Sequence, residues 1–336
     1  MAFTVSRSRI SPVQVIQEGT PGSIEAAAPT TAGVLTYGSA VPMNIAVDKF
    51  EFRPHSSTFT RPTDVIGRRL WNVGFNTLMS GPGSLVAATA PTVVGFKALD
   101  AMFESCAAIS TYVDATSITF NPATVANSGK SATVFANPGN NKIYKAHGVL
   151  GNITLRGNPR GAVELQYRGQ GLYNVPANVG SEFTSWSGGS QRAQAFLGAT
   201  CTINNGTSYT PVIKSFEFDM GNTISEIDDA NSTNGLFGLF ISDRNPMLRV
   251  TIGADGDASA GVDWDGLYSD MTGASPTTHA VSIAWGSTGG IKCTLAALTA
   301  QVIDVQLNES GPMIDATISY KLQHATAETE WSLQIT

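Results

Sequence analysis

The sequence predicts a mainly β protein of two tandem β-sandwich or half-barrel domains, each flanked by one short α-helix. Charged residues make up only 14% of the 336 residues, hydrophobic residues 42%, and glycine occurs 34 times. This profile is typical of short strands joined by many turns, with an uncharged polar surface. Apolar and polar residues alternate along many short segments, as in half-buried strands. The same order of predicted elements occurs twice, which indicates an internal repeat.

The first series of elements begins with a strand from Ile45. A polar, proline-broken stretch at 53–69 is predicted to form a projecting loop. An alternating strand around Trp71 follows, and the segment 95–106 carries apolar side chains at helical spacing. Further strands end in a hairpin whose turn, Gly157 to Gly161, consists of residues that favour turns.

The second series repeats this order after residue 208. A strand at 211–220 precedes a polar loop, and then come a strand, a short helix around Trp264, more strands and a closing hairpin. The tripeptide Phe-Glu-Phe occurs at 50–52 and at 216–218 and is interpreted as one duplicated strand. The predicted divisions are an N-terminal strand and extended arm at 1–44, a first domain at 45–175, a linker at 176–208, a second domain at 209–326 and a C-terminal tail at 327–336.

The two predicted polar loops carry opposite charges. We expect them to meet where copies of the chain alternate around a ring or along a stack, because such pairing sets orientation and register; two solvated loops of drifted charge are the open alternative. The candidate contact residues are Arg53, Arg61, Arg68 and Arg69 in the first loop, and Asp219, Glu226, Asp228 and Asp229 in the second.

The polar faces of the two predicted hairpins are candidates for the wall of a lumen or for an outer surface. Both faces are rich in uncharged hydrogen-bonding groups, and neither alternative is favoured by the pattern alone. The residues concerned are Asn152, Thr154, Gln166, Thr317, Ser319 and Gln323.

No motif in the sequence indicates catalysis, a cofactor or a metal site. Gly129-Lys130-Ser131 matches the end of a phosphate-binding loop, but Thr124 stands where that motif needs glycine, and a strand-like segment follows instead of a helix. The histidines lack metal-ligand spacing. The three cysteines are widely spaced and predict no disulfide framework. We therefore expect no enzyme activity and a protein made in a reducing cytosol, without a membrane span.

The order of phrases along about residues 45–325 resembles the phage major tail tube proteins of long, non-contractile tails. The resemblance depends on "GRRLWNVGFNTLMSGPG", "ALDAMFESC", "SITFNPA", "SGKSATVFA" and "GVLGNITLRGNPRGAVELQYRGQGLY", and on "PVIKSFEFDMGNTISEIDDANSTNGLFGLFISDRNPM" in the second half. In that family a β-sandwich flanked by a helix closes into rings whose inner wall is a continuous β-barrel, and the rings stack into a tube.

The resemblance implies a structural virion protein of the phage tail, assembled in the host bacterial cytoplasm. A tandem copy implies trimeric, pseudo-hexameric rings. The implied partners are further copies of the chain, the tape-measure protein, the tail terminator and distal tail proteins, and viral DNA passing without specific binding. The alternative is another virion or adhesin-like β-sandwich that binds a receptor or glycan, for which Trp186 is the candidate aromatic contact.

Overall fold

The fold is mainly β, which confirms the fold class predicted from the sequence at that level. The described part of the chain contains 22 strands and two helices. The computed structural model describes residues 13–26, 33–37, 42–51, 63–82, 96–123, 130–137, 142–178, 192–193, 195–204, 206, 208–253, 264–273, 277–310, 313–324, 326 and 328–336.

The elements follow one another as short and long antiparallel strands with one helix in each half. In the first half they are β1 (Val13–Gln17), β2 (Gly33–Val34), β3 (Met43–Phe50), β4 (Val65–Leu78), β5 (Ser80–Gly81), α1 (Phe96–Glu104), β6 (Ala108–Val113), β7 (Ser117–Pro122), β8 (Ala132–Ala136), β9 (Lys142–Gly157), β10 (Glu164–Tyr173) and β11 (Ala177–Asn178). In the second half they are β12 (Arg192–Ala193), β13 (Thr200–Asn204), β14 (Ser208–Tyr209), β15 (Ile213–Asp219), β16 (Asn222–Asp228), β17 (Leu236–Arg244), β18 (Met247–Gly253), α2 (Trp264–Thr272), β19 (Thr278–Trp285), β20 (Cys293–Ser310), β21 (Met313–Gln323) and β22 (Ser332–Ile335).

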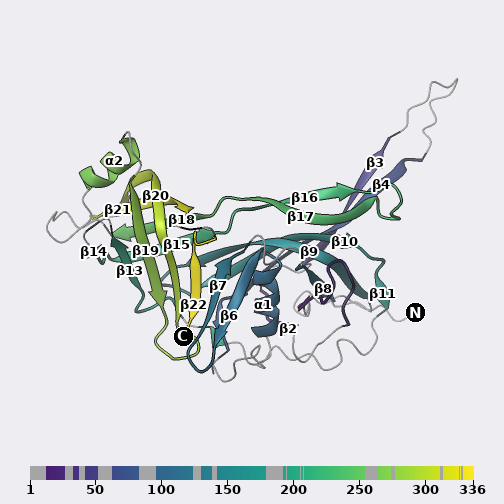
Figure 1. Ribbon diagram of the computed structural model, residues 1–336, viewed down its shortest axis with the longest axis horizontal. Coiled ribbons are helices and arrows are strands. Elements are labelled where there is room, and N and C mark those ends of the chain that lie inside the picture. Colours follow the sequence, from purple (N-terminus) through teal and green to yellow (C-terminus); the bar gives the residue numbers. More distant parts are fainter. Residues whose placement is uncertain are drawn as a thin grey trace.

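One antiparallel sheet runs through both halves of the chain (Figure 1). It passes from β3 through β4 and β10 to β9, and β9 pairs with β15 of the second half. At this join Phe218 lies opposite Leu155 and Asp219 lies opposite Thr154. The sheet continues from β15 through β18, β21 and β20 to β19 and β13.

The strands of the two halves pair in the same order. In the first half the order is β1, β8, β9, β10, β4, and in the second half it is β13, β19, β20, β21, β18. The helix comes after β4 and the two-residue β5 in one half, and after β18 in the other. A fully buried tyrosine lies at the same point of each series: Tyr167 is opposite Phe75 of β4, and Tyr320 is opposite Leu248 of β18.

The two copies of Phe-Glu-Phe occupy different places in this arrangement. Phe50 lies at the far end of β3, opposite Val65, and is 65% exposed. Phe216 and Phe218 are buried in β15, between β18 and β9. β3 and β15 hold corresponding places, beside β4 and β18, but the tripeptide does not lie at matching positions along them, so the interpretation of the tripeptide as one duplicated sequence was wrong.

The segment expected to be a C-terminal tail contains a strand of the main sheet. Leu333 of β22 lies opposite Leu295 of β20 on one side and opposite Phe120 of β7 on the other. The preceding Trp331 is 1% exposed and packs edge-on against Phe218, with ring centroids 5.3 Å apart. The last residues thus connect the two halves, because hydrophobic burial holds β22 between them.

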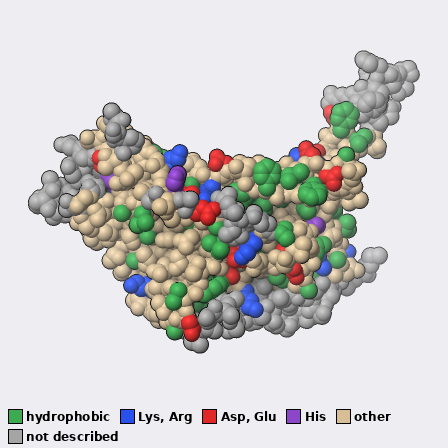
Figure 2. Space-filling model, viewed as in Figure 1, with side chains coloured by type: hydrophobic (Ala, Val, Ile, Leu, Met, Phe, Trp, Pro, Cys, Tyr) green, Lys and Arg blue, Asp and Glu red, His purple; other side chains and the backbone are tan. Residues whose placement is uncertain are grey.

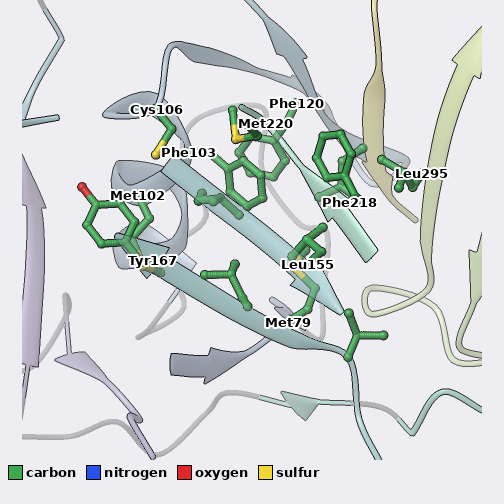
Figure 3. Close-up of a cluster of buried hydrophobic side chains, with 14 of the residues drawn as sticks. Met79, Met102, Phe103, Cys106, Phe120, Leu155, Tyr167, Phe218, Met220 and Leu295 are labelled. Atoms are coloured by element: carbon green, nitrogen blue, oxygen red, sulfur yellow. The ribbon is translucent and has the colours of Figure 1, made fainter. Parts of the chain in front are cut away.

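The core is continuous from the first half to the second. Figure 3 shows Phe218 and Met220 of the second half beside Phe103 and Phe120 of the first. The rings of Phe103 and Phe120 stack with centroids 4.4 Å apart, so α1 is fixed against β7. All three cysteines are buried and free.

Candidate assembly surfaces

The candidate polar residues of the first hairpin share the face of β9 and β10 opposite the core. Ile153 and Tyr167 point into the core, and Asn152 and Gln166 alternate with them. The Gln166 Nε2 group donates to Asn76 Oδ1 at 3.3 Å, across to β4. Thr154 is on the same face, but only 8% of it is exposed because β15 packs beside it.

The candidate polar residues of the second hairpin also share one face, opposite Ile318 and Tyr320. The hydroxyl of Thr317 lies 3.1 Å from that of Thr251 on β18, and Gln323 donates to Gln301 on β20. Ser319 is 4% exposed. Uncharged side chains therefore hydrogen-bond across neighbouring strands on both polar faces, as the sequence suggested for such a surface.

A row of alternating charges crosses the polar face where the two halves join. Cross-strand neighbours lie on one face of a sheet, so consecutive members of this row are adjacent. Arg156 donates to Glu217 across the join at 2.7 Å. From β10 to β20 the row contains three acidic residues and two arginines in alternation, with one serine before the last acid. The members in order are Glu164, Arg156, Glu217, Arg249, Ser319 and Asp304.

The described parts of the two expected charged loops contain strands. Arg53 and Arg61 lie outside the described residues. Arg68 and Arg69 belong to β4, and the acidic residues extend from the end of β15 through β16 to the turn after it; these residues are Asp219, Glu226, Asp228 and Asp229. The prediction of a loop was wrong for residues 65–69 and 222–228, because these pair as hairpin strands, whose solvent-facing side chains give them a polar composition.

Opposite charges from the two hairpins meet within one chain. The guanidinium of Arg68 pairs with Asp48 of β3 at 2.9 Å, with Asp228 of β16 at 3.4 Å, and with Glu226 of β16. The β16–β17 hairpin reaches Arg68 because it extends from the second half across β9 and β10 towards β4 (Figure 1). This convergence gives Arg68 three carboxylate neighbours.

Backbone contacts and a small apolar cluster fix the β16–β17 hairpin to the first half. The Arg69 amide donates to the Asn234 carbonyl at 3.0 Å, and Asn234 Nδ2 donates to the Tyr173 carbonyl at 2.8 Å. Leu236 packs with Leu70 and Leu172. These contacts lie at one end of β4 and β10, where Leu70 is opposite Leu172, whereas Glu164 of the charge row lies at the other end, opposite Leu78.

The root of the hairpin depends on one glycine. Gly221 has a φ of 65°, and a Cβ there would lie 2.0 Å from the Asn245 carbonyl oxygen. A side chain is excluded on both grounds. The next residue, Asn222, donates from Nδ2 to the carbonyls of Cys106 at 2.7 Å and Gly151 at 3.1 Å. The direction of the hairpin is therefore set at its first residue.

The surface view agrees with an uncharged polar exterior. Figure 2 shows charged side chains scattered over a face that is mostly neutral, with hydrophobic groups in small patches. Within the described ranges, no cluster of three His, Cys, Asp or Glu side chains could hold a metal ion. Neither described helix has the length and apolar character needed to cross a membrane.

Lys130 and Ser131 of the phosphate-loop-like motif have structural partners. Lys130 pairs with Glu104 of α1 at 2.6 Å, and Ser131 donates to the buried carboxylate of Glu18. Glu18 also accepts the backbone amide of Gly148 at 2.7 Å. β8 follows directly, which confirms the strand predicted after the motif.

Two carboxyl groups of α1 are buried beside this site. Burial raises the pKa of Asp100, and the nearby polar side chains of Tyr112 and Ser110 offset part of that rise. Burial likewise raises the pKa of Glu104, although Lys130 lowers it in part. Because the folded state favours the protonated form of Asp100, its contribution to stability is present below the unfolded pKa and is lost as pH rises through the folded pKa.

The variant Asp100→Asn should become more stable relative to the wild type as pH is raised from about 4 to 8, because asparagine carries no charge to bury. Thermal unfolding followed by circular dichroism across this range tests the expectation. The variant Asp114→Asn, at an exposed turn, is the matched control. A constant difference between Asp100→Asn and the wild type at all pH values would contradict it.

Comparison of the sequence with protein-family models gives no match, and neither does a search of curated proteins.

Proposed function

We propose that the chain is a structural virion protein that assembles with copies of itself into stacked rings, which form a phage tail tube for genome delivery. The observation that carries the proposal is the repeated strand order, in which each half is one β unit with one helix. Tandem duplication of a tail tube domain explains this order. In this proposal the two units correspond to the domains expected at 45–175 and 209–326, with β1 of the expected arm added to the first and β13 of the expected linker added to the second.

The way in which the two units join supports assembly. The join places β9 of one unit beside β15 of the other, so it uses different surfaces of each unit. Such a head-to-tail contact leaves a free copy of each surface at the ends, and repetition generates a ring or a filament. Three chains would supply six units, which is the pseudo-hexameric ring that the resemblance to tail tube proteins implies.

The polar face supports a role as a conduit. Its charge row alternates in sign, whereas a surface that grips phosphates needs a continuous basic stripe. A lumen lined by this face would let DNA pass without specific binding. The tape-measure protein, the tail terminator and the distal tail proteins are the further partners that this function requires.

The alternative of a glycan- or receptor-binding module has less support. Trp186 lies outside the described residues. Trp71, Trp285 and Trp331 are each at most 4% exposed, so none of these three offers an aromatic surface to a sugar.

Negative-stain electron microscopy of the purified protein tests the proposed function. We expect rings or tubes of uniform diameter whose end-on views have threefold symmetry and six similar lobes. True sixfold rings would keep the function but would mean that the two units lie at different radii. Monomers at all concentrations and salt conditions would overturn the proposal.

A further inference from the structure

We propose that residues 303–309 of β20 form the docking edge for a second copy of this chain, which adds a strand there as β15 adds to β9 within the chain. The proposal deepens the self-assembly put forward above and rests on it. The same edge of the central strand, β9 in the first half and β20 in the second, is occupied differently in the two halves.

In the first half this edge is occupied along most of its length. β10 lies along one edge of β9. Along the other edge of β9, residues 144–149 pair with β8 and residues 154–157 pair with β15. A strand of the second half, β15, therefore pairs with the part of the β9 edge that lies beyond β8.

In the second half no described strand occupies the equivalent part of the edge, although α2 contacts β20. β21 lies along one edge of β20 as far as Ser310. β19 occupies the other edge only as far as Gln301, which lies opposite Thr278. Among the described residues, no strand pairs with this edge between residues 303 and 309. An open edge of this length is a template for pairing with another chain.

Exposed apolar side chains cluster at the open edge. Ile303 is 39% exposed, Leu307 is 47% exposed, and Ile314 of the adjoining β21 is 51% exposed. At the corresponding place in the first half, the ring of Phe216 covers Gly157, where a Cβ would lie 2.4 Å from the ring. The second half therefore exposes apolar side chains at this edge of β20, but no described strand covers them as β15 covers the edge of β9.

The occupant is a second copy because the chain already contains the matching element. β15, which fills the edge of β9, lies beside β18. In the first half, residues 35–37 run in the same place beside β4: the Tyr37 amide donates to the Asn76 carbonyl at 3.0 Å, and Thr77 donates to the Leu35 carbonyl at 2.8 Å. In a neighbouring copy this segment, which leads into β3, would add to β20.

The test compares two lysine variants of β20. Leu307→Lys places a charge at the open edge, where it opposes pairing. Leu298→Lys is the matched control, because Leu298 is 64% exposed on the same strand but lies where β19 already pairs. Both sites are exposed in the single chain, so both variants should fold, and circular dichroism checks this.

We expect Leu307→Lys to raise the concentration needed for assembly by at least about tenfold, while Leu298→Lys assembles as the wild type does. In the wild type, the amides of residues 303–309 that face the open edge should be protected in assemblies and exchange rapidly in dilute solution, whereas the amides that face β21 should be protected in both. Wild-type rings together with normal rings from Leu307→Lys would overturn the docking edge and leave the proposed function standing. Absence of wild-type assembly would overturn both, and twofold dimers closed through β20 alone would overturn the head-to-tail pairing.

Discussion

Replacing Trp331 with alanine is expected to lower the free energy of unfolding by about 3–5 kcal/mol, the cost of removing a large buried aromatic side chain. Trp331 is 1% exposed and contacts Phe218 of β15. It also precedes β22, which pairs with β20 of the second half and β7 of the first. The substitution should therefore weaken the connection between the halves as well as the local core.

Urea unfolding followed by circular dichroism measures this effect, and limited proteolysis reports whether the C-terminal strand is released first. The variant Trp331→Phe is the control. The buried indole Nε1 finds no hydrogen-bond partner in the described structure, so phenylalanine keeps most of the packing and loses no hydrogen bond. An unfolding midpoint of Trp331→Ala equal to that of the wild type would show that β22 does not hold the halves together.

Local periodicity was sufficient to predict several individual elements of this fold. The apolar stripe from Phe96 to Cys106 predicted α1, the alternation around Trp71 predicted β4, and the turn at Gly157 to Gly161 predicted the β9–β10 hairpin. These features are fixed by contacts between residues close in sequence, so a single chain sequence carries their signal.

The joins between elements could not be predicted in this way. Pairing of β15 with β9 and of β22 with β7 depends on which edges remain open after the rest of the sheet forms, and no local pattern encodes that. For the same reason the charge row was missed, because Arg156 and Glu217 are 61 residues apart. A short motif produced a false match: the two copies of Phe-Glu-Phe agree in sequence but lie at different positions along their strands.

Composition also misled the prediction of the charged stretches. A polar segment with many acids, such as 219–234, resembles a loop, but a hairpin that lies on the surface of another unit has the same composition. Its apolar contacts are few, with Leu236 in the cluster with Leu70 and Leu172, so its alternation is weak. The opposite charges of the two stretches did indicate an interaction, and the structure brings Arg68 and Glu226 together within one chain.

Reversing the charge of Arg68 is expected to release the β16–β17 hairpin from β4. In Arg68→Glu a fourth carboxylate joins Asp48, Glu226 and Asp228, and like charges repel where three ion pairs had formed. Arg68 is about one-third exposed, so each lost pair is worth roughly 0.2–1 kcal/mol. We therefore expect a small loss of global stability, faster amide exchange along residues 222–244, and impaired assembly.

Two further variants separate a specific charge contact from a general effect. Arg156→Glu removes an ion pair with Glu217 outside the hairpin, so it should leave exchange in β16 and β17 unchanged. The double variant Arg68→Glu with Glu226→Arg restores one opposite-charge pair and should recover part of the protection. Raising the salt concentration should make the wild type and Arg68→Glu more alike, because salt screens exposed charges. Normal exchange and normal tubes from Arg68→Glu would mean that Leu236 and the Asn234 hydrogen bonds hold the hairpin without the charges.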